Sequence, residues 1–327
     1  MRAIIAPTPG GPEVLQWTET EAPTAQPGEV EIDVEAFGLN KAESYYRSGN
    51  YGTLVPDRSL GIEAVGVVHR DPSGALAPGQ RVVTAMGGMM FARHGSYAER
   101  IAVRRSNLVP IDVDLDSARL AALPMAYLTV WGALDKNLGI QAGQSLLVRG
   151  ATSSVGMAAV AYAKARGLRV LATTRNPDRR EKLESIGADQ VLIDTGELCE
   201  QVRSAVPGGV DGVLEIVGAS TVRDSLKSTC PWGQVVVIGL LGGPPVLDSF
   251  NLMGDLPNTV RLSFFGSALL GSEAMPLDAS PLKWVAQQVA AGAIPDTLAQ
   301  SFSVEQIQDA HRLLDRNTAT GKIVVQF

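Results

Sequence analysis

Short apolar runs, separated by glycine, proline and charged residues, make up most of the first third of the chain. Those with the residue types of strands are residues 2–5, 29–34, 64–69, 81–84 and 97–103. Strands this short and this regularly interrupted are typical of an antiparallel, barrel-like unit. The pattern therefore predicts a β-rich domain at the start of the chain.

From about residue 122 onward, apolar strands alternate with helical segments. The helices are predicted at 155–166 and 182–186, and the strands at 146–148, 169–173, 190–193, 213–217 and 235–238. These strands are almost continuously apolar, as expected where helices cover both faces of a sheet. Alternation of this kind predicts an α/β unit with a doubly wound parallel sheet, the Rossmann arrangement.

Two further segments complete the pattern. The apolar window at 120–134 predicts a buried helix, because it is shorter than a bilayer span and Pro124 interrupts it. After about residue 271 we expect helices at 282–291 and 304–315, and a last strand at 322–327 that rejoins the first domain. A chain of 327 residues is long enough for two domains.

Composition narrows the class of function. The chain is 45% hydrophobic and 19% charged, as globular proteins are, and its net charge of −6 with no basic run argues against a nucleic-acid partner. Cys199 and Cys230 are too few for a disulfide framework, and the N-terminus lacks the apolar stretch of a signal peptide. We therefore expect a cytoplasmic protein that acts on a small molecule, away from membranes.

The sharpest local signal is the run Leu-Leu-Val-Arg-Gly-Ala-Thr-Ser-Ser-Val-Gly at 146–156. An apolar strand enters a loop of small residues that opens a helix, so a pyrophosphate can approach the backbone and the free N–H groups there. A serine replaces the middle glycine of the G-x-G-x-x-G pattern, so an ordinary strand-to-helix turn is the alternative. The predicted cofactor contacts in this loop are Gly150, Ala151, Thr152, Ser153, Ser154, Val155 and Gly156.

The end of the second strand of this unit favours NADPH over NADH. An acidic residue there would bind the ribose hydroxyls of NADH and repel a 2′-phosphate. Here Thr174 is followed by Arg175, with Arg179 one turn later, and Asp178 lies past the strand end. Arginines suit a dianionic phosphate, although a solvated helix start is the alternative interpretation.

Motifs along the whole chain resemble the medium-chain dehydrogenase/reductase superfamily, in its zinc-independent, zeta-crystallin-like quinone oxidoreductase branch. In order they are GGPEVL at 10–15, PGEV at 27–30, GLN at 38–40, SYYRSGNY at 44–51, LGIEAVGVV at 60–68, GSYAE at 95–99, AH at 310–311 and GKIVV at 321–325. The resemblance implies a GroES-like barrel formed by residues 1–122 and 272–327, with a Rossmann NADPH-binding domain at 123–271. It also implies a homodimer, paired through the sheet edge at 260–265.

Zinc enzymes of this superfamily hold a catalytic metal with Cys and His, and the matching positions differ here. Asn40 stands where those enzymes place a Cys, and Ile62 where they place the His of a Gly-His-Glu motif. Glu63 alone cannot hold zinc. The three histidines, which we expect on the surface or in loops, have no ligand spacing; they are His69, His94 and His311. The sequence therefore predicts no metal site.

Without a Lewis acid, alcohol oxidation loses the group that stabilises an alkoxide. Hydride acceptors whose developing negative charge needs less stabilisation are therefore favoured. Quinones and α,β-unsaturated carbonyl compounds spread the developing charge onto an oxygen that one or two hydrogen-bond donors can stabilise. A 2-enoyl-thioester reductase of fatty-acid or polyketide metabolism is the alternative within the enzymes. A protein that binds NADPH with little turnover is the alternative of another class.

The resemblance assigns further site residues. Asn40, Tyr45 and Tyr51 are expected near the nicotinamide and substrate, with the Asn40 amide toward the cofactor and Tyr45 as a stacking wall or a donor. Arg47 is expected to be a salt-bridging loop residue, and Lys322 to reach the cofactor or to pair on the surface. Asp194 stands where some relatives have a cofactor-contacting Tyr. The remaining predicted cofactor contacts are Thr129, Val217, Gly218, Ile238, Gly239 and Leu240.

Overall fold

The computed structural model describes residues 1–327 and divides them into two units. The first, here the barrel unit, comprises residues 1–128, 268–292 and 296–327. The second, the nucleotide unit, comprises residues 129–267 and 293–295. The domain boundaries expected at residues 122 and 271 stay a prediction.

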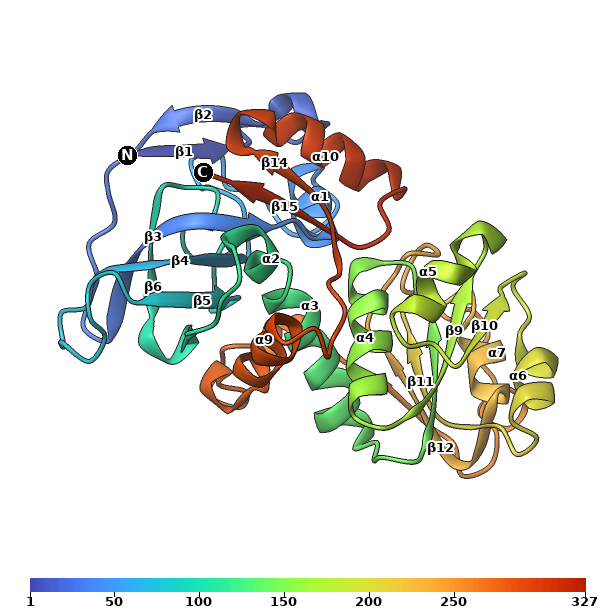
Figure 1. Ribbon diagram of the computed structural model, residues 1–327. Coiled ribbons are helices and arrows are strands. Elements are labelled where there is room, and N and C mark those ends of the chain that lie inside the picture. Colours follow the sequence, from blue (N-terminus) through green and yellow to red (C-terminus); the bar gives the residue numbers. More distant parts are fainter. The chain divides into compact units, whose positions relative to one another are not determined.

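A seven-stranded sheet forms the barrel unit, and its strands come from both ends of the chain (Figure 1). The long strand β3 (Glu29–Gly38) pairs antiparallel with β4, β6 and β15, and only β14 and β15 run parallel. The other strands of this sheet are β4 (Glu63–Arg70), β5 (Arg81–Ala85), β6 (Arg100–Arg104), β7 (Leu108–Pro110), β14 (Leu298–Ser303) and β15 (Lys322–Gln326). A separate hairpin joins β1 (Arg2–Ile5) to β2 (Gln16–Glu19). This largely antiparallel unit, with α2 (Ser117–Ala121) and α9 (Leu282–Ala290), agrees with the predicted GroES-like class.

Two helices of the barrel unit position residues discussed below. Helix α1 (Lys41–Arg47) follows directly on Asn40, and α10 (Ile307–Arg316) packs against both α1 and β15. The predicted helix at 304–315 therefore exists, but its first turn, Val304–Gln306, is a 3-10 helix.

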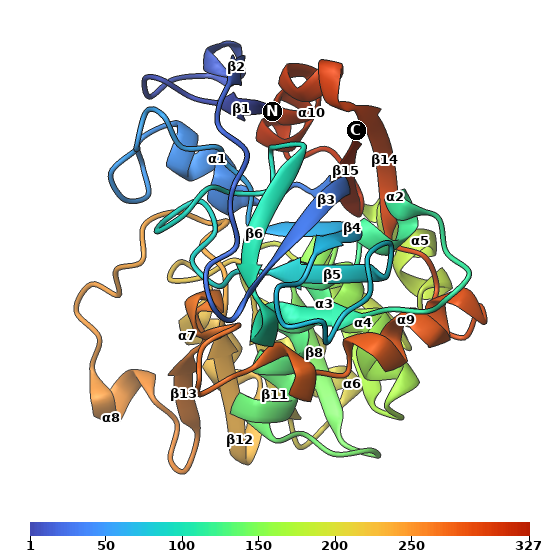
Figure 2. The same cartoon turned by 90° about the vertical axis from the view of Figure 1, so that its left-hand side faces the viewer.

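The nucleotide unit is built on a parallel sheet whose strand order is β10-β9-β8-β11-β12-β13. Numbered within the unit this is 3-2-1-4-5-6, the Rossmann order, so the predicted fold class is confirmed. Figure 2 labels β8, β11, β12 and β13 of this sheet. The strands are β8 (Ser145–Arg149), β9 (Arg169–Thr174), β10 (Gln190–Ile193), β11 (Val210–Glu215), β12 (Thr229–Val237) and β13 (Arg261–Phe264). The helices are α4 (Ser154–Ala165), α5 (Arg180–Ser185), α6 (Cys199–Ala205), α7 (Val222–Lys227) and α8 (Leu252–Asp255). Apolar strand residues such as Leu147, Val213 and Val235 are fully buried, as expected for a sheet covered on both faces.

The prediction of one buried helix over 120–134 is wrong. Helix α2 ends at Ala121, and α3 (Pro124–Trp131) begins at the proline, which suits the first turn of a helix because it has no N–H to donate. A π-helical segment, Gly132–Leu138, follows. The proline that interrupts the apolar window is therefore the start of a second helix.

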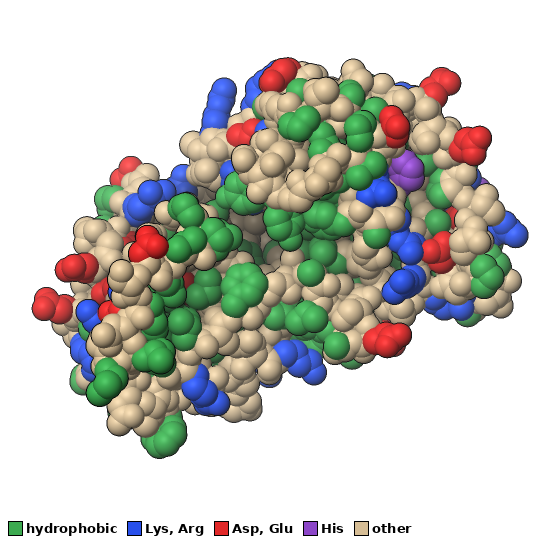
Figure 3. Space-filling view, turned by 180° about the vertical axis from the view of Figure 1, so that it is seen from behind, with side chains coloured by type: hydrophobic (Ala, Val, Ile, Leu, Met, Phe, Trp, Pro, Cys, Tyr) green, Lys and Arg blue, Asp and Glu red, His purple; other side chains and the backbone are tan.

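Charged side chains are mixed on the surface. On the face drawn in Figure 3, Lys and Arg side chains are interspersed with Asp and Glu, in keeping with the absence of a basic run in the sequence. The described helices include none with the length and apolar character needed to cross a bilayer.

Candidate functional site

The predicted cofactor contacts of the nucleotide unit gather at one edge of its sheet. The strand order reverses between β8 and β11, and ligands of such sheets bind outside the carboxyl ends of the strands at this switch point. The loops that leave the carboxyl ends of β8, β9, β11 and β12 hold Gly150–Gly156, Thr174–Arg175, Val217–Gly218 and Ile238–Leu240. Thr129 lies elsewhere in the unit, half-buried on α3.

Two glycines make the loop after β8 possible. Gly150 has a φ of 88°, in the left-handed region that favours glycine. A Cβ on Gly156 would lie 2.5 Å from the Gly150 carbonyl oxygen and 2.7 Å from the Ala151 Cα. The loop therefore turns tightly over the first residues of α4, whose backbone N–H groups have no partner within the helix. This is the arrangement that a pyrophosphate requires.

The two serines of the loop differ in what their hydroxyl groups do. The Ser153 hydroxyl accepts from the Gly156 N–H at 3.1 Å and donates to the Gly150 carbonyl at 2.9 Å, so it caps α4. The Ser154 hydroxyl makes no hydrogen bond within the structure and is half-exposed. Of the two donors expected from the sequence, only Ser154 is free for a ligand.

At the end of β9, Thr174 is buried and Arg175 is exposed. The Thr174 hydroxyl accepts from the Asn176 N–H at 3.1 Å and donates to the Asn176 carbonyl at 3.0 Å, which fixes the turn. Arg179 lies in the 3-10 turn that follows, Pro177–Arg179. No acidic side chain belongs to the end of this strand itself.

A buried glutamate holds the turn after β11. The Glu215 carboxylate accepts from the N–H groups of Val217 (2.8 Å) and Gly218 (3.0 Å), and burial raises its pKa. Gly218 has a φ of 105°, and a Cβ on Gly239 would lie 2.3 Å from the Ile216 carbonyl oxygen. Because both turns contain glycine, no side chain at these positions prevents a ligand from approaching the backbone at this edge of the sheet.

In the barrel unit, Asn40 and Lys322 meet two buried glutamates. The Lys322 Nζ lies 2.5 Å from Glu63 Oε1 and donates to Asn40 Oδ1 at 2.6 Å, and both ends of the ion pair are almost fully buried. Asn40 Nδ2 donates to Glu63 Oε1 at 2.8 Å and to Glu43 Oε1 at 3.3 Å. Both amide hydrogens of Asn40 thus have partners, so an Asn40 contact to a cofactor requires one of them to be exchanged. The alternative that Lys322 pairs on the surface is wrong.

Glu43 is the second carboxylate of this cluster. It is fully buried on α1 and accepts from the Asn40 backbone N–H at 3.0 Å. Burial raises its pKa to about 7, with the ammonium of Lys322 opposing the shift and the nearby Glu63 adding to it. The cluster therefore has one glutamate that is half-protonated near neutral pH, next to a salt-bridged one.

The expectation that all three histidines lie at the surface or in loops is wrong for His311. His311 is fully buried on α10, where Arg47 Nη1 lies 2.7 Å from its Nδ1 and the Tyr97 hydroxyl 2.9 Å from its Nε2. Arginine only donates, so Nδ1 is the acceptor and the neutral ring carries its hydrogen on Nε2. Burial and then Arg47 lower the His311 pKa to about 3, so the ring is neutral at physiological pH.

Arg47 is correspondingly more than a loop residue. It is buried at the end of α1 and binds Asp315 of α10 at 2.7 Å in addition to His311. Arg47 does form a salt bridge, but it belongs to a helix instead of a loop, and the bridge is an internal link between α1 and α10.

Tyr45 and Tyr51 are both exposed, with 37% and 49% of their surface accessible. Tyr51 packs edge-on against Phe91, with ring centroids 5.6 Å apart, and Tyr46 packs on the same ring at 5.5 Å. Neither the Tyr45 nor the Tyr51 hydroxyl has a hydrogen-bond partner within the structure. Their rings and hydroxyl groups are therefore available to a ligand.

The side chains that bind catalytic metals do not assemble. No group of three or more His, Cys, Asp or Glu side chains is arranged to hold a metal ion. Lys322 fills the space beside Glu63 and Asn40, so the local cation at these positions is an ammonium.

Sequence reasoning did not find Glu43 or the buried Arg149. The signal for Glu43 was its place three residues after Asn40, since a glutamate there reaches back to the first N–H of a helix. The signal for Arg149 was a charge at the end of an otherwise apolar strand of a covered sheet.

Comparisons with known proteins cover most of the chain. Residues 26–113 match the family described as alcohol dehydrogenase GroES-like domain, and residues 154–281 the family described as zinc-binding dehydrogenase. A 2-haloacrylate reductase from Burkholderia sp. is 27% identical, over 97% of this chain and 96% of that protein. Quinone oxidoreductase from Homo sapiens is also 27% identical, over 99% of this chain and 97% of its own length. A mycobacterial protein solved with NADPH is 26% identical, with a TM-score of 0.85 and complete coverage of both chains.

Proposed function

Because the chain belongs to the medium-chain dehydrogenase/reductase superfamily, we propose that it is an NADPH-dependent enzyme that transfers hydride to a quinone or a conjugated carbonyl compound without a metal ion. It is an oxidoreductase of that superfamily, similar over its whole length to quinone oxidoreductases. Beyond this class of enzyme, we propose the cofactor, the class of acceptor and a reaction without a metal ion.

The end of β9 is the observation that carries the choice of cofactor. An exposed Arg175 follows Thr174 where a carboxylate would select NADH, and the mycobacterial relative was solved with NADPH. The tight loop at Gly150–Gly156 suits a pyrophosphate, because its two glycines allow the backbone to turn closely over the first N–H groups of α4. When bound, NADPH supplies the hydride. Arg175, Arg179 and the free Ser154 hydroxyl then hold its phosphates.

The barrel unit supports an acceptor that needs only hydrogen-bond donors. Two of the three Lys322 ammonium hydrogens are used by Glu63 and Asn40, which leaves one. Tyr45 and Tyr51 offer free hydroxyl groups and exposed ring faces for a flat substrate. We propose that these residues, with Asn40, contact the nicotinamide or the substrate. Charge that develops on a quinone or enone oxygen is spread by conjugation, so such donors suffice.

We also propose that the protein is a homodimer, paired through β13. This strand lies at the edge of the six-stranded sheet, and Phe264 at its end is 65% exposed. An unpaired edge with an exposed aromatic residue suits pairing with a second copy of itself. The cytoplasmic location expected from the cysteine pattern stays a prediction.

The test is the loss of NADPH absorbance with purified protein and a panel of acceptors. The panel holds benzoquinone, phenanthrenequinone, an alkenal, a 2-haloacrylate and crotonyl-CoA, each with NADPH and with NADH. We expect NADPH-dependent turnover of quinones or of the conjugated compounds, unchanged by a chelator. Turnover of the thioester alone would make the protein an enoyl-thioester reductase. Tight binding of NADPH without turnover of any acceptor would contradict the catalytic proposal.

A further inference from the structure

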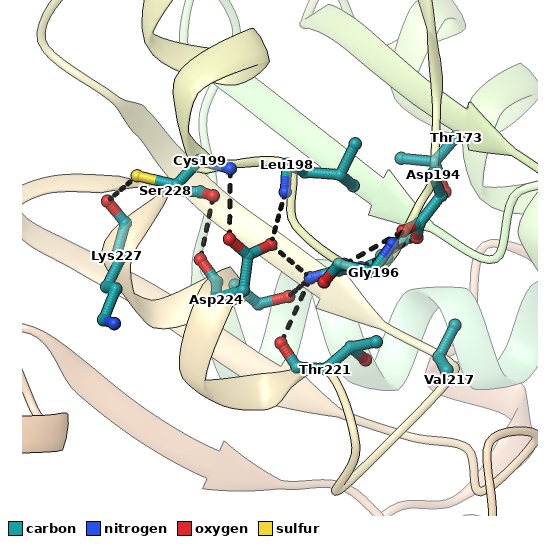
Figure 4. A network of polar contacts seen from close by, with 12 residues as sticks. Thr173, Asp194, Gly196, Leu198, Cys199, Val217, Thr221, Asp224, Lys227 and Ser228 are labelled. Carbon is teal, nitrogen blue, oxygen red and sulfur yellow. Dashed lines mark hydrogen bonds and ion pairs between the residues drawn. The ribbon is translucent and has the colours of Figure 1, made fainter.

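Arg149 is a fully buried arginine at the last position of β8, one residue before the phosphate-binding loop. Its guanidinium contacts segments from separate parts of the nucleotide unit. Four residues of these segments, Asp194, Gly196, Thr221 and Asp224, are labelled in Figure 4. All five of its N–H groups have acceptors. These acceptors are both carboxylate oxygens of Asp194, the carbonyls of Gly196 and Thr221, the Asp224 carboxylate and the Ser225 hydroxyl.

Asp194 lies next to the place where the cofactor's ribose is recognised. It directly follows β10, and its backbone N–H donates to the Thr174 carbonyl at 2.9 Å. Ile193 pairs with Thr174 across the two strands, and Asp194 and Arg175 are the residues that directly follow this last pair. A free carboxylate here would attract ribose hydroxyl groups and repel a 2′-phosphate.

The Asp194 carboxylate is not free. Arg149 Nε lies 2.9 Å from Oδ2 and Arg149 Nη2 lies 3.0 Å from Oδ1, a two-point contact that suits the planar guanidinium. The Gly196 N–H also donates to Oδ1 at 2.9 Å, and only 9% of the Asp194 side chain is exposed. The negative charge beside the end of β9 is therefore paired with the guanidinium and directed into the sheet.

We infer that Arg149 sets the preference for NADPH indirectly, by binding the Asp194 carboxylate and so removing a negative charge from beside the 2′-phosphate. The inference rests on the proposed NADPH-dependent function. Arg149 is a positioning residue, since it acts through Asp194 and the loop after β10. Arg175 and Arg179 attract the 2′-phosphate, and Arg149 offsets the Asp194 carboxylate that would repel it.

Arg149 also faces two other acidic groups, Asp224 and Glu215. Asp224 accepts from Arg149 at 2.7 Å and from the N–H groups of Leu198 and Cys199. Glu215 is linked to Arg149 through the Ser225 hydroxyl, which accepts from Arg149 and donates to Glu215. A purely structural role would hold these loops together and would affect both cofactors equally. The ratio of NADPH to NADH affinity separates the two roles.

The experiment measures the dissociation constants of NADPH and NADH by fluorescence titration, for the wild type, Arg149→Gln, Asp194→Asn and the double variant. In Arg149→Gln the unpaired carboxylate should weaken NADPH binding at least about fivefold relative to NADH, because it would repel the 2′-phosphate. In the double variant the ratio should return to within about twofold of the wild type. Equal losses for both cofactors in Arg149→Gln, with no recovery of the ratio in the double variant, would overturn the inference.

Asp194→Asn alone decides the matter if Arg149→Gln does not fold. With the carboxylate removed, it no longer offsets the positive charge of Arg149, so the ratio should shift toward NADPH by about fivefold. An unchanged ratio would show that a charge at Asp194 does not reach the 2′-phosphate and would overturn the inference. Asp189→Asn is the matched control, since it removes the same charge at the opposite end of β10. The wild-type preference tests the proposed function, and only the change between variants tests Arg149.

Discussion

The cluster of Asn40, Glu43, Glu63 and Lys322 shows how single residues shape the chemistry of the barrel unit. One ammonium lies between the amide oxygen of Asn40 and the Glu63 carboxylate. The cluster explains Gly38, because a Cβ there would lie 2.3 Å from Lys322 Cε and 2.6 Å from Glu63 Oε1. Two glutamates against one lysine leave an excess carboxylate, and Glu43 accommodates it by holding a proton up to about neutral pH.

Glu43 should make the stability of the protein fall as pH rises through weakly acidic values. Its pKa is raised from 4.5 to about 7 by burial, so between these values the folded state binds a proton that the unfolded state has lost. The stabilisation is fully present below about pH 4.5 and is lost by about pH 7. Relative to the wild type, Glu43→Gln should gain on the order of 2 kcal/mol between about pH 5 and about pH 8.

Urea unfolding of both proteins across this range checks the prediction. The contribution of His311, whose pKa is about 3 in the folded state, is present in both proteins and cancels in the difference. Stability curves of the two proteins that run parallel with pH would contradict the assignment of the titration to Glu43.

Lys322→Met should be strongly destabilising because it leaves the Glu63 carboxylate buried without a cation. Removal of one partner from a buried pair typically costs about 3–5 kcal/mol. Lys322→Met combined with Glu63→Gln should recover most of this loss, because no unpaired charge remains. The pair Lys164 and Asp189 is the control, since it is 48% and 33% exposed and should contribute less than about 1 kcal/mol. Unfolding free energies in a double-mutant cycle for each pair give the two coupling energies. Equal coupling energies for the buried and the exposed pair would contradict the prediction.

At the scale of elements, the site is made by the ends of strands and the first turn of α4. The strand β8 delivers Gly150, the loop turns at a φ that glycine tolerates, and Ser153 fixes the start of the helix. The neighbouring strands β9, β11 and β12 end at the same edge and contribute their turns. The site therefore depends on caps and turns more than on the helices themselves.

The two serines of this loop should separate stability from cofactor binding. Ser153→Ala removes the cap of α4 and should cost about 1 kcal/mol of unfolding free energy. Ser154→Ala removes a hydroxyl without an internal partner, so it should change stability by less than about 0.5 kcal/mol. If the Ser154 hydroxyl contacts a phosphate, the same substitution should weaken NADPH binding about three- to tenfold. Thermal unfolding and NADPH titration of both variants check the crossed pattern, and identical profiles for the two variants would contradict it.

Elements were the easiest part to predict from the sequence, because their signals are local. The apolar runs and the glycine loop indicated the parallel sheet, and the motifs along the chain indicated the superfamily. The buried polar residues were missed because their partners lie far away in the sequence, as for Arg149 with Asp224 or Arg47 with His311. His311 was misplaced for the same reason, since nothing on its own helix shows that Tyr97 and Arg47 meet it.

At the scale of the whole molecule, the unpaired edge of the six-stranded sheet in the nucleotide unit is the feature that favours association with a second copy. The strand β13 pairs with β12 on one side only, so its other side presents unpaired N–H and C=O groups. The strand begins with an exposed Arg261 and ends with Phe264, which has 65% of its surface exposed. A second copy related by a twofold axis would pair β13 with itself and continue the sheet.

Phe264→Glu should therefore convert the proposed dimer into monomers. A carboxylate would replace an apolar ring in the interface, and burial of a charge opposes association. Met253→Glu is the matched control, because this side chain is 97% exposed but lies on α8, outside the edge strand. Light scattering after size-exclusion chromatography measures the mass of each protein. A wild type that elutes as a monomer, or a Phe264→Glu variant that stays dimeric, would contradict an interface at β13, because a carboxylate at a buried position opposes association.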